Sequence, residues 1–356
     1  MAASARITPP RTVAEIVRED LRPRLAAIDA GEYPVDVLRA LGAAGTFAHH
    51  VEGTPEGLLA AIDAMGQAGE ACLSTAFCIW CQDALVWYLA RSEEAGPRRH
   101  LAAFADGAAL GGTGLSNPMK AFSGIEPLAL RCEREGAGYR VRGRLPWVSN
   151  LVPGHLFAGI ASLPDGRRVM GLFEAGTAAV AIAANARFVA LEGTGTVTVM
   201  VRDAYLPDAD VIAHDVAAFV PRIRNGFVLL QTGMGLGLVR GVARLMREDA
   251  RGRHDGRYLP LGPEAIEARA EVLRERVAAA AVRHAETDRA TFLDTLRLRL
   301  DVSLLALEAA QSAMLQFGAR GYLEGSEPFR RLREAQFVAI VTPSVKHITT
   351  ELARAA

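Results

Sequence analysis

The most constraining feature of this sequence is its hydrophobic period, which changes twice along the chain. Up to about residue 110, apolar side chains recur at intervals of three and four, most clearly from Leu73 to Tyr88, which predicts buried helices. Between about Leu110 and Val211, short alternating runs are separated by glycine-containing turns, which predicts strands. From Val216 onward the period is helical again. A helical block, a β block and a second helical block therefore follow one another.

Several helix boundaries can be predicted within the helical blocks. Thr12 can cap a helix over 13–30 that kinks or breaks at Pro23, because a threonine hydroxyl accepts N-terminal amides and proline disrupts a helix interior. Thr54 with Pro55 marks another helix start. The later block contains four long helical segments, for which a four-helix bundle is the simplest packing: 216–251, 262–286, 289–319 and 327–354.

The chain length is consistent with this division. Its 356 residues allow two or three structural units. We expect an N-terminal helical domain at 1–110, a middle β domain at 111–211 and a C-terminal helical bundle at 212–356. The predicted fold class is therefore mainly α with a central β domain.

Charge and composition exclude several classes of partner. Lys+Arg and Asp+Glu both total 40, so no basic field is available to hold nucleic acid or an anionic membrane. Met1 to Thr12 has no apolar signal region, and the apolar stretch from Phe227 to Val239 is interrupted by polar residues and glycines, so we expect no membrane segment. Four cysteines are too few for a disulfide framework and suit a reducing compartment. We expect a cytoplasmic protein with free thiols.

The order helices, β domain, helical bundle is uncommon, and it resembles the acyl-CoA dehydrogenase flavoproteins. The family's short motifs are also matched in order, at Gly31-Glu-Tyr-Pro-Val35, Ser116-Asn-Pro118, Pro146-Trp-Val-Ser-Asn150, Gln316-Phe-Gly-Ala-Arg-Gly-Tyr322 and Arg333-Glu-Ala335. The resemblance covers essentially the whole chain. It implies an N-terminal helical domain, a middle β-barrel, a C-terminal four-helix bundle and a bound flavin, FAD or alternatively FMN.

The resemblance assigns cofactor contacts to two motifs of the β block. Trp147 would lie against the flavin ring and the Ser149 hydroxyl near its N5, where the family has threonine. Leu115 and Ser116 would supply donors to the pyrimidine side. The alternative is that Trp147 is a core aromatic residue and both serines are ordinary turn residues.

The phosphate end of the cofactor site departs from the family. Phe122 stands where the family has its phosphate-binding serine, and Ser123 is the candidate substitute. The family's Arg-x-x-Phe-Gly is missing, with the segment 251–257 in its place, so FAD and FMN both stay open. The resemblance also places Gln316, Gly318 and Ser344 at the cofactor. Lys120 and Lys346, which are the chain's two lysines, lie beside these segments and suit compact anions, although both could equally be surface residues.

The family's catalytic base is not conserved in this chain. Acyl-CoA dehydrogenation needs a base that removes the α-proton, and the family uses a glutamate before its last helix. That position is Thr342, whose neutral hydroxyl cannot replace a carboxylate. Some relatives carry the glutamate on the first bundle helix, but the matching segment 224–231 contains no acid. The catalytic residues are therefore left unassigned.

Other sequence features favour structural interpretations. Cys78-Ile-Trp-Cys81 lies within an apolar helical pattern, so helix core is favoured over a metal or redox site. His49, His50 and His347 are expected to be surface or capping residues rather than proton donors. Gly233-Met-Gly-Leu-Gly237 follows no strand, which favours close helix packing over dinucleotide binding.

The sequence therefore predicts a flavin-dependent oxidoreductase, with an acyl-CoA or a related apolar small molecule as substrate and an electron acceptor or oxygen as second partner. One alternative is a monooxygenase that uses reduced flavin and O2 and needs no carboxylate, although Val338 and Val341 replace the histidines expected there. Another is a non-catalytic ligand-binding or partner subunit. A homodimer or homotetramer is expected, because segments such as Leu304 to Gln311 are apolar on more than one face.

Overall fold

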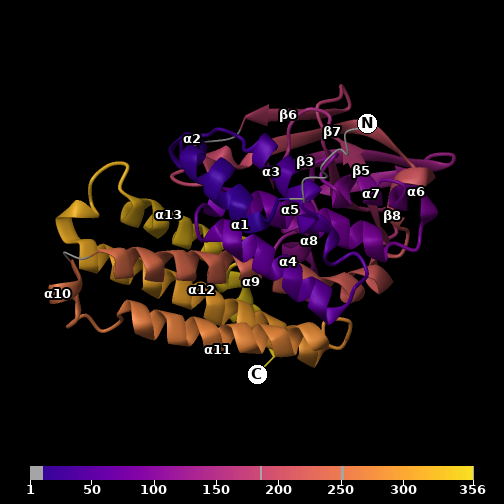
Figure 1. The fold of residues 1–356 in the computed structure, drawn as a ribbon. Coiled ribbons are helices and arrows are strands. Elements are labelled where there is room, and N and C mark those ends of the chain that lie inside the picture. The colour runs from indigo at the N-terminus through magenta and orange to yellow at the C-terminus, as the bar shows by residue number, and fades with distance from the viewer. Residues whose placement is uncertain (1–10, 185–186, 250–251, 356) are drawn as a thin grey trace, which may run out of the picture.

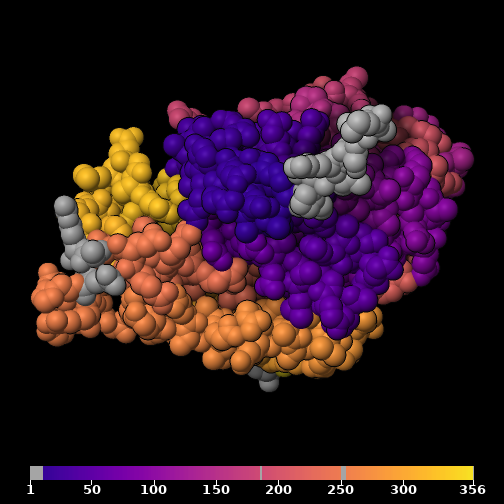
Figure 2. All heavy atoms as spheres, in the orientation of Figure 1, coloured from indigo at the N-terminus to yellow at the C-terminus, as the bar shows by residue number. Residues whose placement is uncertain are grey.

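The computed structural model describes residues 11–184, 187–249 and 252–355 (Figure 1). The predicted order of blocks is confirmed: helices come first, strands follow, and long helices close the chain. The N-terminal helices cover the upper part of the bundle, beside the sheet (Figure 2). Most of the N-terminal segment 1–12, as well as Arg251, lies outside the described residues.

The N-terminal block begins as predicted. Thr12 and Glu15 form a reciprocal capping box, and the path after it changes to a π-helical turn and then to a tight turn that contains Pro23. Thr54 caps the helix that starts at Pro55. The helices are α1 (Val13–Ile16), α2 (Leu25–Asp29), α3 (Val35–Ala43), α4 (Pro55–Gly69), α5 (Leu73–Arg91), α6 (Ala95–Arg98) and α7 (Leu101–Ala105).

Helix α5 lies in the centre of the molecule. Every residue from Leu73 to Leu89 is buried, so the helix is enclosed on all sides rather than on one wide face. α5 and the later helix α9 (Val216–Glu248) are long and apolar enough to cross a membrane by length and composition. However, 94% of the most apolar window of each is buried inside the protein. Their apolar side chains form the larger of two hydrophobic cores.

The middle block is a sheet of eight strands with a second core of its own. β3 and β7 are the two longest strands of the sheet, and they pair antiparallel. Along the hydrogen-bonded path the order is β6-β7-β3-β2-β4-β5-β8, and β1 pairs with β4. The strands are β1 (Gly111–Thr113), β2 (Leu130–Arg134), β3 (Gly138–Val148), β4 (Leu156–Ser162), β5 (Arg168–Glu174), β6 (Val180–Ala184), β7 (Val197–Pro207) and β8 (Val211–Ala213).

Two details of the sequence prediction were wrong. The β block contains a helix, α8 (Ser116–Phe122), because Ser116-Asn-Pro118 starts a helical turn and the stretch lacks strand alternation. The expected helix 327–354 is two helices, α13 (Glu327–Ile340) and α14 (Val345–Ala353). Pro343 disfavours helix for the residue before it, and Ser344 caps α14 by accepting from the His347 amide.

The bundle runs lengthwise beneath the rest of the molecule (Figure 1). It consists of α9, α11 (Pro263–Val282), α12 (Arg289–Phe317) and α13, with the short α10 (Gly252–Gly256) at one end and α14 after the last turn. Asp215 and Asp288 cap α9 and α12 by accepting backbone amides.

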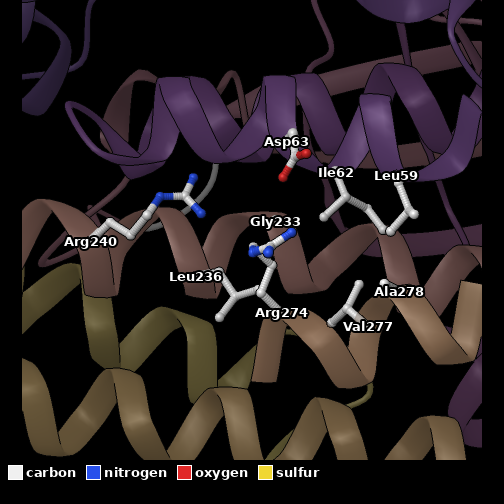
Figure 3. A pocket seen from close by; sticks show the side chains of 9 residues that line it. All are labelled: Leu59, Ile62, Asp63, Gly233, Leu236, Arg240, Arg274, Val277 and Ala278. Atoms are coloured by element: carbon white, nitrogen blue, oxygen red, sulfur yellow. The ribbon is translucent and has the colours of Figure 1, made fainter. Parts of the chain in front are cut away.

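Glycines set the approach of α9 to α4, as their sequence predicted. A Cβ on Gly233 would lie 2.6 Å from the Ile62 carbonyl oxygen, and one on Gly237 would lie 2.3 Å from that of Gly66. Beside this crossing α4, α9 and α11 enclose a cavity of about 40 Å³ (Figure 3). Such a volume suits water rather than a metabolite, so the candidate functional site lies elsewhere.

Candidate functional site

The main candidate site is a cavity of about 330 Å³ where the sheet, α5 and the end of α13 meet. Its lining comes from the larger core, from the edge of the sheet and from the loop between β6 and β7. The lining residues are Phe77, Trp80, Cys81, Thr113, Ser116, Lys120, Trp147, Ser149, Phe188, Ala190, Leu191, Thr194, Thr196, Phe227, Phe337, Ile340, Val341 and Thr342. A cavity of this size and lining suits a small organic ligand.

The sheet contributes an aromatic wall. Trp147, the second-to-last residue of β3, is 46% exposed although it is a large apolar side chain. Its ring lies 5.7 Å from that of Phe188, at an interplanar angle of 58°. A half-exposed indole at a cavity wall offers a flat apolar face to a ligand.

A row of hydroxyl groups lies beside this wall. The Ser149 Oγ is 2.6 Å from the Thr196 Oγ1, which is 2.8 Å from the Thr194 Oγ1. The turn at Ser149 is fixed by Asn150, whose amide donates to the Gly111 carbonyl at 2.6 Å. The site therefore presents hydroxyl donors at a rigid position next to Trp147.

The helices supply the opposite, apolar wall. Phe77 stacks on Trp80 with ring centroids 5.5 Å apart and meets Phe337 edge-on at 4.6 Å. Phe227 packs against Trp80 at 5.0 Å and accepts the indole N–H through its carbonyl at 3.3 Å. Three helices, α5, α9 and α13, thus hold one aromatic cluster in place.

Thr342 closes the cavity at the turn between α13 and α14. Its Oγ1 lies 2.9 Å from the Ser116 Oγ, and its carbonyl accepts the Gln231 amide at 2.8 Å. Gln231 in turn accepts from the Nε of Arg299 at 2.9 Å. Arg299 is fully buried, and burial lowers the pKa of its guanidinium to about 10. This chain of hydrogen bonds fixes the turn from behind.

The cavity is poor in charge. None of the described lining residues is Asp or Glu, and Lys120 is the charged side chain among them. The Lys120 Nζ lies 3.3 Å from both carboxylate oxygens of Glu126. Burial raises the pKa of the Cys81 thiol well above its usual value, so Cys81 is neutral and unreactive. The described lining therefore offers no general base of carboxylate type.

The structure brings together several of the residues singled out in the sequence, Lys120, Cys81 and Val341 among them. Ser116, Trp147 and Ser149 line the cavity with Thr342, and Leu115 is buried beside them at the start of α8. The resemblance expects cofactor contacts at Leu115, Ser116, Trp147 and Ser149, whereas Thr342 stands at the position of the family's glutamate.

Four other predicted residues do not line this cavity. Ser123 and Ser344 lie beyond it, at the end of α8 and the start of α14. Gln316 and Gly318 lie at the end of α12, where the Gln316 amide donates to the Met246 carbonyl at 2.7 Å. Within one chain, the motif at Gln316 therefore contributes nothing to the cavity.

The sequence did not assign the aromatic wall to a site. Phe77 and Trp80 were expected to be buried helix residues, which they are, and nothing local indicates that they face a cavity. The sequence does offer a signal for Thr196, because this hydroxyl residue directly precedes the largely apolar strand β7. Cys78 and Cys81 are buried in α5 as predicted, and the described residues contain no cluster suited to a metal ion.

Similar solved structures are found for the whole chain. Butyryl-CoA dehydrogenase from Megasphaera elsdenii matches with a TM-score of 0.83 and 15% identity, over 96% of this chain and 95% of that chain. Glutaryl-CoA dehydrogenase from Mycobacterium smegmatis in complex with FADH2 matches with a TM-score of 0.75 and 16% identity, over 96% and 92%. Nitrososynthase from Micromonospora carbonacea var. africana matches with a TM-score of 0.77 and 19% identity, over 100% of both chains.

The chain therefore has the acyl-CoA dehydrogenase fold, which confirms the predicted fold class. At the level of sequence, no family model and no curated protein matches it. The similar solved structures are named for different reactions, so the fold alone does not identify the reaction of this protein.

Proposed function

We propose that this protein is a flavin-dependent oxidoreductase whose cavity between the sheet and α5 holds the flavin ring and an apolar substrate. The observation that carries the proposal is the half-exposed Trp147 beside fixed serine hydroxyls, in a cavity enclosed by aromatic side chains.

The residues present fit a flavin. A flat ring system needs an apolar wall, which Trp147 supplies, and donors at its edge, for which Ser149 and Ser116 are placed. When bound, the flavin would supply two-electron transfer. The chain itself would orient the ring through Trp147, hydrogen-bond its edge through the two serines, and exclude water with the aromatic cluster.

The opposite wall defines the kind of substrate. Phe77, Phe227 and Phe337 offer an apolar surface without a carboxylate or an unpaired cation, so a small apolar group is favoured there. An acyl-CoA is the nominal substrate of the fold. However, the neutral Thr342 hydroxyl, which is paired with Ser116, cannot remove an α-proton as a carboxylate would.

A second candidate is a monooxygenase that uses reduced flavin and oxygen. The lack of a carboxylate in the described lining favours it, because oxygen chemistry at a reduced flavin requires no such base. Substrate-dependent oxygen consumption by the protein supplied with reduced flavin would favour this candidate over a dehydrogenase, which needs oxidised flavin to accept electrons from its substrate.

A flavin titration tests the proposal. We expect the protein to bind FAD or FMN, and Trp147→Ala to weaken that binding about tenfold or more, since a stacking surface of this size is removed. The matched control is Tyr205→Ala, which truncates an aromatic side chain of similar exposure, 45%, on β7 outside the cavity lining. Failure of the wild type to take up either flavin would exclude the oxidoreductase and favour the non-catalytic alternative.

A further inference from the structure

Three hydroxyl groups of the cavity form one continuous row that ends at a backbone carbonyl. The row starts at the Ser149 Oγ, which is bonded to the Thr196 Oγ1, and this atom is bonded in turn to the Thr194 Oγ1. The Thr194 Oγ1 lies 2.7 Å from the carbonyl oxygen of Leu191. All three hydroxyl residues line the cavity, and Ser149 stands two residues after the half-exposed Trp147. The row therefore has a fixed end at Leu191 and an open end at Ser149.

The fixed end determines the direction of every hydrogen bond in the row. A carbonyl oxygen can only accept, so the single hydroxyl proton of Thr194 is donated to Leu191. Thr196 must then donate to Thr194, and Ser149 must donate to Thr196, because each hydroxyl has one proton to give. The three protons are used in these three bonds. Ser149 therefore turns only oxygen lone pairs toward a ligand.

Reversing this direction is costly because the row is buried and held in place. Thr194 is 1% exposed and Ser149 is 6% exposed. The Asn150 amide N–H donates to the Thr194 carbonyl at 2.8 Å, which fixes the two segments against each other. A ligand acceptor can take the Ser149 proton only if two oxygen atoms 2.6 Å apart, those of Ser149 and Thr196, are left without a proton between them. Ser149 therefore favours a ligand atom that carries its own hydrogen.

The second hydroxyl pair of the cavity has the opposite polarity. Ser116 and Thr342 share one hydrogen bond between two hydroxyl groups, and neither hydroxyl contacts a further acceptor among the described residues. One of their two protons is therefore left for a ligand. The cavity thus offers an acceptor at Ser149 and a donor at Ser116 and Thr342.

The position of the row indicates which flavin atom would face Ser149. The Thr194 carbonyl lies 3.8 Å from the Cys78 Sγ of α5, and α5 also carries Phe77 and Trp80 of the apolar wall. The flavin atom that exchanges hydride with a substrate has to lie on the side of that wall, and this atom is N5. N5 is an acceptor in oxidised flavin and carries a hydrogen in reduced flavin. Only the reduced ring matches the polarity of Ser149.

We propose that Thr194 and Thr196 are positioning residues that make Ser149 a hydrogen-bond acceptor, so that the site binds reduced flavin more tightly than oxidised flavin. This polarity is the reverse of a hydroxyl that donates to an oxidised ring. The proposal rests on the proposed flavin site and adds to it the oxidation state that the chain's own hydroxyl groups favour.

Anaerobic calorimetric titration of the protein with FMN and with FAD, each in its oxidised and its dithionite-reduced form, measures this preference. We expect reduced flavin to bind about tenfold tighter, because a hydrogen bond to Ser149 replaces a contact between two acceptors. Thr194→Val should lower this ratio severalfold by tightening the binding of oxidised flavin, since Thr196 can then donate to Ser149 and release the Ser149 proton. Thr196→Val should act in the same direction, since Ser149 then has no hydroxyl partner.

Two further variants separate this effect from a loss of packing. Thr194→Ser keeps the hydroxyl group and should retain the wild-type ratio. Thr198→Val is the matched control, because it removes a buried hydroxyl that donates to the Pro146 carbonyl at 3.3 Å outside the cavity lining, and it should leave the ratio unchanged. In Thr194→Val the Leu191 carbonyl keeps the Thr194 amide as a donor at 3.2 Å, so no buried acceptor is left unpaired there.

Each outcome decides the proposal. Circular dichroism verifies that the variants fold, and either folded valine variant of the row suffices for the comparison. Equal affinity of the wild type for the two oxidation states, tighter binding of oxidised flavin, or an unchanged ratio in a folded valine variant of the row overturns the proposal while the flavin site stands. If neither FMN nor FAD binds in either state, the proposed function fails, and this proposal fails with it.

Discussion

His347 shows how a single buried residue makes stability depend on pH. Burial lowers the pKa of its imidazole below the ordinary value of 6.5; Glu351 acts in the opposite direction, and Lys120 and Arg354 reinforce the effect of burial. The folded state therefore binds the proton less readily than the unfolded chain. The stability contributed by neutral His347 is present above about pH 6.5 and is lost as the pH falls through the folded-state pKa.

We predict that His347→Gln flattens this dependence. Between about pH 7.5 and pH 5, the free energy of unfolding should fall less in the variant than in the wild type. Urea unfolding at several pH values measures the free energy of unfolding of both proteins. The control is His49→Gln, which changes an exposed histidine. A variant whose pH profile parallels that of the wild type would show that His347 does not titrate differently on folding.

At this scale the sequence predicted part of the site. Trp147 and Ser149 lie at the end of a strand and directly after it, within one short motif, so their place in the cavity could be anticipated from local sequence. The opposite, apolar wall could not be anticipated in this way, because Phe227 and Phe337 reach the cavity through helix packing that no local pattern encodes. Ser123 is a predicted cofactor residue, but its pairing with His347 depends on the position of α14, and the sequence pattern predicts α14 only as part of a longer helix.

At the scale of elements, glycines allow a close helix crossing between α4 and α9. The approach is possible because neither helix carries a side chain at the contact, as the Gly237 and Gly66 backbones show. Farther along the same helix, Phe227 of α9 packs against Trp80 of α5, so α9 also contributes to the cavity wall.

We predict that Gly237→Ala destabilises the protein by about 1–3 kcal/mol, because the added methyl meets backbone atoms that cannot move independently. Gly69→Ala at the same crossing is the matched control, since its Cβ would have neighbours at 3.4 Å or more, an ordinary contact distance. Thermal or urea unfolding of both variants compares them. Equal stability of the two variants would contradict the role assigned to the crossing.

The order of elements was predictable because helix and strand periods differ over long segments. The exact ends of helices that meet in irregular stretches could not be predicted from these periods. The turn from Val341 to Ser344 joins two helical patterns, and Pro343 is the residue in the sequence that signals the break between α13 and α14.

At the scale of the whole molecule, one end of the bundle carries exposed apolar side chains. Leu315, Tyr322 and Leu323 are 55%, 79% and 64% exposed, close to the motif at Gln316 that lies outside the cavity of its own chain. Such a patch is expected to be covered by another protein surface. We propose a closed dimer or tetramer in which this end contacts a second copy.

Light scattering at micromolar concentration tests this assembly, and Leu323→Asp should shift the population toward monomer. The matched control is Val272→Asp, which places the same charge at an exposed position of α11, 56% exposed, on another part of the bundle. A monomeric wild type would exclude the assembly.

We propose that the cavity holds a flavin beside Thr342 and that its described lining supplies no carboxylate base. The most direct test is anaerobic mixing of the flavin-loaded protein with a panel of straight-chain and branched acyl-CoAs, read by loss of the flavin's visible absorption. General-base assistance contributes about 100- to 10,000-fold to such proton transfers, so we predict bleaching that is slow or absent. Thr342→Glu may be compared alongside, although Pro343 restrains the new side chain, so the wild-type result decides. Rapid bleaching of the wild-type flavin by any acyl-CoA would contradict the account and require a base outside the described lining of the cavity.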